Sequence, residues 1–189
     1  MRLAIRVLFV AVLMGAVTVP VSAQDSAAAR AAAPPAANPR DVESVDAILG
    51  ALYAVISGDS GVARNWDRFR SLFAPGARLI PVGQRQGGAV GARVLTPEEY
   101  IQRAGPMLVN SGFHEREIAR RSESYGRITH AFSTYESRRK VADAAPFARG
   151  INSIQLYNDG TRWWVQTIFW WGETPETPLP PRYLESERH

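Results

Sequence analysis

The residues of this sequence best suited to acid–base chemistry lie in one polar segment between Phe113 and Arg139. Polar and apolar residues alternate there, which predicts two antiparallel strands joined by a two-residue turn at Tyr125 and Gly126. In that register, one face of the hairpin carries Glu115, Glu117, Arg121, His130 and Glu136. If that face lines a pocket, burial and like charge raise the pKa of one carboxylate toward neutral pH, where it can act as a general acid or base.

The same pattern also fits a solvent-exposed face whose charges are bridged by Arg116, Arg138 or Arg139. The sequence leaves both interpretations open, because a register shift of one residue would move every one of these side chains to the other face. Under the pocket interpretation, His130 and Glu136 are the candidate catalytic residues.

No metal site or cofactor site is predicted. His114 and His130 fall in different predicted strands, and the sequence contains no cysteine, so the ligand spacing of a zinc motif is missing. The glycine-rich loop "GQRQGGAVG" lacks the Gly-Lys-Ser/Thr ending of a phosphate-binding loop. We therefore expect a protein that works without a metal or cofactor.

The N-terminus indicates export. Arg2 and Arg6 precede an apolar run, "VLFVAVLMGAVTV", and "VSA" at 21–23 fits a cleavage site. The alternative is a membrane anchor, but the apolar run is short for a bilayer span. We expect a signal peptide at 1–23, a mature start near Gln24, a periplasmic or secreted location, and no membrane attachment after cleavage.

The rest of the chain divides into an Ala/Pro-rich linker at 24–40, one domain at 41–172 and a Pro-rich tail at 173–189. The chain has 189 residues and a formal net charge of +4, but no block of Lys and Arg interleaved with aromatic residues. A nucleic-acid partner is therefore not expected.

Within the domain, hydrophobic spacing predicts helices first and strands later. A helix capped by Asp41 runs to Ile56, a short helix starts at Asn65, and a third starts at Thr96 and is kinked or split at Pro106. A strand is expected at 77–82 and a short one at 93–95. Four long strands follow, at 113–124, 127–139, 147–157 and 162–171. This order predicts an α+β fold: a curved antiparallel sheet with three helices packed on one face.

The last predicted strand has large apolar residues on both faces. Strict alternation places Trp164, Gln166, Ile168 and Trp170 toward the helices and Trp163, Val165, Thr167, Phe169 and Trp171 on the other face. A half-solvated sheet would be polar on one of these faces, so both are expected to be covered. The helices cover one face, and the tail or a second subunit covers the other.

The domain resembles the nuclear transport factor 2-like (SnoaL-like) superfamily, a cone-shaped fold. The stretches that carry the resemblance are the amphipathic opening helix, "W-x-x-F-x-x-x-F-x-P-G" from Trp66, "TPEEYI" from Thr96, and "DG-x-x-WW" from Asp159. The last segment is similar to that of secreted bacterial members with no assigned activity. The resemblance implies a homodimer formed through the outer sheet face. In enolising members, an Asp or Glu removes a proton while a Tyr or a protonated acid holds the oxyanion, but no motif matches residue by residue.

The fold class implies an enclosed pocket between the sheet and the helices. We expect Tyr53, Trp66, Asn152, Gln166 and Trp170 to line it, and Tyr53 or Tyr135 to act as a hydrogen-bond donor. The predicted function is binding of a small hydrophobic molecule. Two alternatives remain: a cofactor-free isomerase or cyclase that uses a pocket carboxylate or histidine, and a non-catalytic dimerisation domain.

Overall fold

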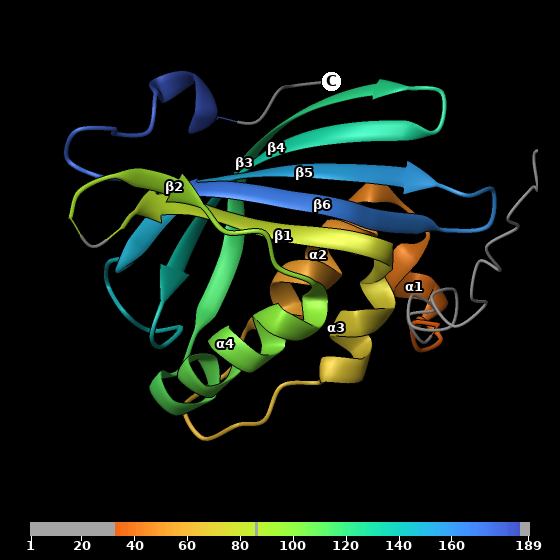
Figure 1. Ribbon diagram of the computed structural model, residues 1–189, viewed down its shortest axis with the longest axis horizontal. Helices are drawn as coiled ribbons and strands as arrows, with labels where there is room; N and C mark the ends of the chain where they lie inside the picture. Colours follow the sequence, from red (N-terminus) through yellow and green to blue (C-terminus); the bar gives the residue numbers. More distant parts are fainter. Residues whose placement is uncertain (1–32, 86, 186–189) are drawn as a thin grey trace, which may run out of the picture. The chain divides into compact units, whose positions relative to one another are not determined.

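The computed structural model describes residues 33–85 and 87–185 (Figure 1). The predicted signal peptide and the beginning of the linker lie outside these residues. Within the described part of the chain, none of the helices has the length and apolar character needed to cross a membrane.

Four α-helices precede or interrupt the strands: α1 (Pro39–Val42), α2 (Val45–Ile56), α3 (Trp66–Leu72) and α4 (Pro97–Ser111). A polar side chain caps each N-terminus and satisfies a backbone N–H that has no partner within the helix. For α4 this is the predicted capping box, in which Thr96 and Glu99 bond to each other's backbone. These caps fix where the helices begin.

One detail of the predicted helices is wrong, and one of the two alternatives at Pro106 is excluded. Asp41 does not cap the long first helix, because Ser44 starts α2, and Asp41 lies inside the short α1 and forms an ion pair with Arg68 at 2.7 Å. The helix from Thr96 is not split at Pro106, which lies inside α4.

Six strands form one curved sheet in the order β2-β1-β6-β5-β4-β3. Their bounds are β1 (Phe73–Gln84), β2 (Val90–Ala92), β3 (His114–Tyr125), β4 (Ile128–Arg138), β5 (Ala148–Asn158) and β6 (Trp163–Gly172). Every neighbouring pair is antiparallel except β1 and β6, which run parallel. The predicted α+β fold class is confirmed; it differs from the prediction in this parallel pair and in the division of the first predicted helix into α1 and α2.

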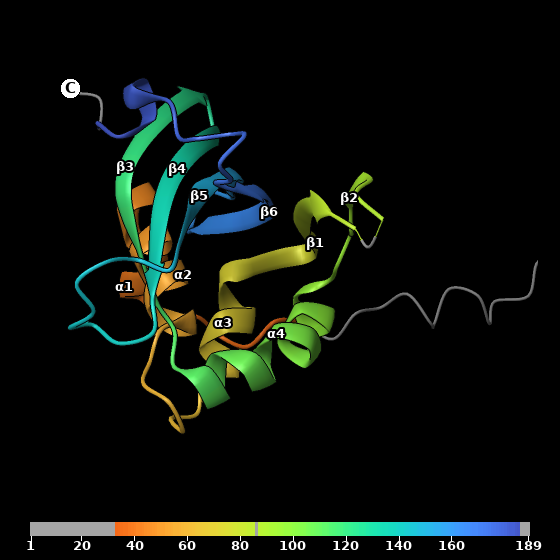
Figure 2. The same cartoon turned by 90° about the vertical axis from the view of Figure 1, so that its left-hand side faces the viewer.

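The helices pack on one face of the sheet, and the C-terminal tail crosses the other (Figures 1 and 2). The core lies between helices and sheet, where Ile48, Phe69, Leu72, Ile154 and Val165 are almost completely buried. This burial of apolar surface provides the main driving force for the arrangement. We call the two sides the helix face and the tail face.

Two β-bulges change which side chains reach each face. In β3, Glu117 pairs with Tyr135 but Ala119 pairs with Thr134, so Ile118 is an extra residue. In β6, Val165 pairs with Leu156 but Thr167 pairs with Gln155, so Gln166 is an extra residue. A bulge interrupts the alternation of side chains along its strand.

The bulge at Gln166 overturns the strict alternation predicted for the last strand. Trp163 and Val165 lie on the helix face with Ile168 and Trp170, instead of on the tail face. Trp164 does not belong to that core; it stacks against Arg162 and donates its indole N–H to Asp159.

The middle hairpin also differs from its predicted register. Tyr125 pairs with Ile128, so the turn residues are Gly126 and Arg127 instead of Tyr125 and Gly126. Gly126 has a positive φ of 55°, which glycine adopts without strain. Together with the bulge at Ile118, this register separates the predicted polar cluster. Glu115 and Glu117 lie on the helix face, whereas Arg121, His130 and Glu136 lie on the tail face.

Candidate active site

A cavity of about 290 Å³ lies between the helices and the sheet. Its walls are mainly aromatic and aliphatic, and include Leu52, Phe69, Phe113, Phe147, Ile168 and Trp170. Six polar side chains also line it: Tyr53, Tyr100, Glu115, Tyr135, Ser137 and Asn152. Apolar walls with a few polar groups are typical of small-molecule sites. We call this space the central cavity.

Glu115 is the carboxylate of the central cavity. It comes from β3, and its side chain accepts a hydrogen bond of 2.8 Å from the Ser137 hydroxyl of the neighbouring strand. Burial raises the pKa of Glu115 to about 7, against the lowering effect of the Ser137 hydrogen bond. Desolvation disfavours the charged form of a carboxyl group, which explains the direction. Glu115 can therefore both accept and release a proton near neutral pH.

The backbone of Glu115 is fixed to the end of α2. The Ser57 hydroxyl accepts a hydrogen bond of 3.0 Å from the Glu115 N–H and lies 3.2 Å from the Glu115 carbonyl oxygen. Ser57 also donates to the carbonyl of Tyr53 at 2.7 Å. The carboxylate is thus positioned by contacts to a helix and to a neighbouring strand.

Three tyrosines surround Glu115 in the central cavity. Burial is the main cause that raises the pKa of Tyr53, Tyr100 and Tyr135, and the charge of Glu115 raises it further in each case. These phenols consequently stay protonated at neutral pH and can serve as hydrogen-bond donors. Tyr100 stacks on Phe69 at 5.5 Å and contacts Trp170 edge-on at 6.4 Å between ring centroids.

Tyr53 belongs to a line of side-chain hydrogen bonds that starts in the central cavity. The Asn152 amide donates to the Tyr53 hydroxyl at 3.2 Å, and that hydroxyl lies 2.6 Å from the Ser133 hydroxyl. Ser133 in turn donates to the carboxylate of Glu117. Asn152, Tyr53 and Ser133 are all buried.

A second, more polar space of about 720 Å³ lies along β3 and α2, and we call it the outer cleft. Asp46, Glu117 and Arg120 line it, and it shares Tyr53 and Glu115 with the central cavity. The outer cleft therefore brings charged groups close to one end of the apolar site.

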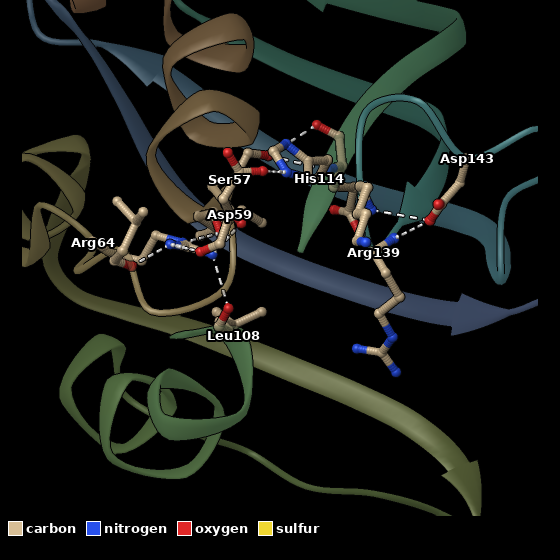
Figure 3. Close-up of polar contacts among 12 residues, drawn as sticks. Ser57, Asp59, Arg64, Leu108, His114, Arg139 and Asp143 are labelled. Atoms are coloured by element: carbon tan, nitrogen blue, oxygen red, sulfur yellow. Dashed lines mark hydrogen bonds and ion pairs between the residues drawn. The ribbon is translucent and has the colours of Figure 1, made fainter. Parts of the chain in front are cut away.

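A buried arginine, Arg64, links the end of α2 to α4, and both helices contribute residues to the central cavity (Figure 3). Arg64 is only 6% exposed and donates to the carbonyl oxygens of Ile56 at 2.9 Å, Gly58 at 2.6 Å and Leu108 at 2.8 Å. These carbonyls belong to the end of α2, the loop after it and the last turns of α4. Arg64 thus fixes the distance between two of the helices that enclose the site.

The structure places three of the five predicted pocket residues in the central cavity: Tyr53, Asn152 and Trp170. Trp66 and Gln166 are not among the described residues that line it. Trp66 instead packs edge-on against Phe69 at 5.8 Å, and Gln166 is the extra residue of the β6 bulge.

Neither of the two candidate catalytic residues, His130 and Glu136, lines the central cavity. The His130 ring is 2.9 Å from the Ser153 hydroxyl. Glu136 accepts hydrogen bonds from Arg116 at 2.7 Å and Arg138 at 3.0 Å. Glu136 lines the outer cleft together with Glu115 and Tyr53, whereas His130 lines neither the outer cleft nor the central cavity.

Two members of the site carried weaker signals in the sequence. Glu115 belongs to the predicted polar cluster, but its partners there depended on a register that is wrong. Tyr100 occupies an apolar position of the helix predicted from Thr96, and nothing in that spacing marks it as a site residue. Its sequence signal is the Thr96 capping box, which fixes the start of α4 and hence the direction of the Tyr100 side chain.

The tail crosses the outer side of the sheet and holds it by polar contacts. Trp171 donates its indole N–H to Thr177 at 3.0 Å, Thr134 donates to the carbonyl of Tyr183 at 2.6 Å, and the Tyr183 ring packs on Phe132 at 5.1 Å. The side chain of Phe169 remains 46% exposed on the same face. Of the two predicted covers of this face, the tail and a second subunit, the tail thus covers part of it.

Among residues 33–85 and 87–185, no group of three or more His, Asp or Glu side chains is arranged to hold a metal ion.

Solved structures resemble this chain in fold, but no family model or curated protein matches its sequence. Similar solved structures include a protein of unknown function with a cystatin-like fold from Nostoc punctiforme, with 13% identity, a TM-score of 0.48, and coverage of 69% of this chain and 89% of that chain. A candidate ketosteroid isomerase from Kribbella flavida has 15% identity and a TM-score of 0.40, and the match covers 80% and 94% of the two chains.

A third similar structure, from Methylobacillus flagellatus, is a nuclear transport factor 2-like protein of unknown function. It has 13% identity and a TM-score of 0.41, and the match covers 69% of this chain and 95% of that chain. At such identities the likeness concerns the fold alone. Nuclear transport factor 2-like proteins are thus among the solved structures to which this chain is similar.

Proposed function

We propose that the central cavity binds a small, largely apolar carbonyl compound and that Glu115 moves a proton on it without a cofactor. The observation that carries this proposal is the position of Glu115, a carboxylate with a pKa of about 7 that faces an apolar cavity among tyrosine hydroxyls. An efficient general base has a pKa near the working pH and lies within hydrogen-bond reach of the proton it takes.

The reaction class follows from these groups. The Glu115 carboxylate takes a proton from the carbon next to the carbonyl group, so a C–H bond breaks and an O–H bond forms on Glu115. The electron pair moves to the carbonyl oxygen, where a hydrogen bond from a cavity tyrosine stabilises the enolate. If a carbon–carbon double bond adjoins that carbon, the enolate extends over it, and return of the proton to the far carbon of the double bond shifts the bond into conjugation, gives an isomer and regenerates the carboxylate. No oxidant, reductant or metal is needed for this sequence.

Hydrogen exchange tests the proposal on simple probes. We expect the protein to speed deuterium incorporation from heavy water into hydrophobic cyclic ketones, as measured by mass spectrometry. Glu115→Gln keeps the shape but removes the base, and should lower the rate at least ~100-fold, the usual contribution of general acid–base catalysis. Glu123→Gln makes the same change at an exposed position of the same strand and should exchange at the wild-type rate. Equal rates for Glu115→Gln and the wild type would exclude the proposal.

A second candidate function is binding without chemistry, and the aromatic walls of the central cavity favour it. In that case the ketones bind but do not exchange. Trp170→Ala should then weaken their binding by roughly 2 kcal/mol, because a large apolar surface is no longer buried against the ligand. Binding that is unchanged in Trp170→Ala would place the ligand outside the central cavity.

A further inference from the structure

The line of hydrogen bonds from Asn152 to Glu117 connects the two spaces of the site. Asn152 and Tyr53 line the central cavity, and Glu117 lines the outer cleft. Ser133 stands between them and is completely buried, with 0% exposure. The two hydroxyl groups can each donate or accept, so the direction of the line depends on the groups at its ends.

An ionised Glu117 fixes one direction. A carboxylate can only accept, so Ser133 donates its proton to Glu117. The Ser133 oxygen then accepts from Tyr53, and the Tyr53 oxygen accepts from the Asn152 amide. In this state the Tyr53 proton points toward Ser133 and is not available to a molecule in the central cavity.

A protonated Glu117 allows the opposite direction. Its carboxyl O–H donates to Ser133, and Ser133 then donates to Tyr53. The Tyr53 oxygen accepts from both Ser133 and Asn152, which uses both of its lone pairs. The Tyr53 hydroxyl then no longer donates its hydrogen bond to Ser133, and it can donate one to an acceptor in the central cavity instead.

We propose that Glu117 is a positioning residue that sets, through Ser133, whether the Tyr53 hydroxyl donates a hydrogen bond into the central cavity. This inference rests on the proposed function, because it assigns Tyr53 a role toward the carbonyl oxygen of the substrate. It makes the site selective for ligands with an acceptor oxygen when Glu117 is protonated. The outer cleft thereby acts on a cavity that Glu117 itself does not line.

Several charged and titratable groups act on Glu117. Arg120 on the same strand lies 3.4 Å away, and its charge favours the carboxylate. Asp46, on α2, carries a negative charge that disfavours the ionised form of Glu117. Tyr53, also on α2, is separated from Glu117 by Ser133. Glu115 stands two residues away on β3, and Tyr135 is the partner of Glu117 on β4.

Burial is the largest influence on Glu117 and raises its pKa. The raised pKa favours the protonated form of Glu117, which is the form that the opposite direction requires.

Nuclear magnetic resonance of the free protein tests the inference without a ligand. The chain has six tyrosines, and labelling their Cζ carbons gives signals that respond to how each hydroxyl is hydrogen-bonded. The Tyr53 signal is identified by its loss in Tyr53→Phe. We expect it to shift with pH at the same midpoint as the labelled Cδ carbon of Glu117. Glu117→Gln should remove this pH-dependent shift, because its amide cannot titrate.

Two further variants separate the line of hydrogen bonds from general electrostatics. Ser133→Ala removes the connecting hydroxyl, so Glu117 should still titrate while the Tyr53 signal stays constant. Glu115→Gln removes the other nearby carboxylate and should leave the Tyr53 shift in place. The inference is overturned if Tyr53 does not respond while Glu117 titrates, or if it shifts equally in Glu117→Gln. Since no substrate is involved, a failure of the proposed catalysis leaves these results unaffected.

Discussion

Glu115 and Glu117 stand two residues apart on β3 and both face the helices, yet they have different surroundings. Glu115 accepts a hydrogen bond from Ser137 and lines the central cavity as well as the outer cleft. Glu117 accepts from Ser133, lies 3.4 Å from Arg120 and lines the outer cleft. β3 therefore supplies two carboxylates to the site. Glu115 lines the central cavity itself, and Glu117 is connected to that cavity through the hydroxyl groups of Ser133 and Tyr53.

The stability of the protein should depend on Glu115 in a defined pH range. Its pKa rises from 4.5 to about 7 on folding, so the folded state binds the proton more tightly than the unfolded state. Below pH ~4.5, Glu115 is protonated in both states and does not change the free energy of unfolding. As the pH rises toward ~7, its ionisation in the unfolded state lowers the free energy of unfolding by on the order of 3 kcal/mol. Glu115→Gln should match the wild type in urea unfolding at pH 4.5 and exceed it at pH 8.

The matched control for this pH effect is Glu123→Gln, which changes an exposed carboxylate on the same strand. Its free energy of unfolding should follow that of the wild type over the whole pH range. A Glu115→Gln variant whose advantage does not grow with pH would mean that Glu115 ionises normally.

Removing the Tyr53 hydroxyl should destabilise the fold. Tyr53→Phe removes the acceptor of the buried Asn152 amide and one of the two partners of the Ser133 hydroxyl, which keeps its bond to Glu117; the loss costs roughly 1–3 kcal/mol. Tyr100→Phe is the control, because no hydrogen bond of the Tyr100 hydroxyl is found within the described part of the chain. It should change the free energy of unfolding by much less. Equal losses in the two variants would argue against the line of hydrogen bonds.

Arg64 should be far more important for stability than an exposed arginine. Arg64→Met keeps much of the side-chain volume but leaves several buried carbonyl oxygens without donors, which should cost about 3 kcal/mol or more. Arg70→Met removes ion pairs to Asp67 and Glu98 at the surface and should cost no more than ~1 kcal/mol. Thermal and urea unfolding of the two variants check this contrast, and a loss in Arg64→Met as small as that in Arg70→Met would contradict it.

The tail face should still mediate self-association. We propose a homodimer in which the exposed ring of Phe169 packs against the partner. A glutamate there would place a charge in the interface, so Phe169→Glu should run as a monomer in size-exclusion chromatography with light scattering, while the wild type runs as a dimer. Tyr125→Glu is the control, because Tyr125 is 86% exposed at the tip of the middle hairpin. A wild-type monomer at micromolar concentration would rule out this interface.

Much of the fold could be predicted from the sequence because its signals are local. The capping box at Thr96 and the turn at Asp159 and Gly160 bracket elements whose hydrophobic period is clear. In that turn the Asp159 carboxylate accepts from the backbone N–H groups of Thr161 and Arg162. Such contacts within a few residues are encoded directly by residue type.

The faces of the strands could not be predicted because each bulge depends on distant partners. Ile118 and Gln166 are ordinary strand residues, and nothing beside them in sequence marks an insertion. What favours the bulges is the packing of Trp163 and Val165 against the core and the hydrogen bond from Ser133 to Glu117. A single extra residue moves all later side chains to the other face, which is why the polar cluster was assigned incorrectly.

The proposed chemistry depends on one property, the protonation of Glu115 near neutral pH. Carbon-13 labelling of the glutamate side chains allows its carboxyl carbon to be followed by nuclear magnetic resonance, with Glu115→Gln to identify the signal. The structure predicts a titration midpoint near pH 7. A midpoint near 4.5, the ordinary value for a glutamate, would contradict the assignment of Glu115 as the acid–base group of the central cavity.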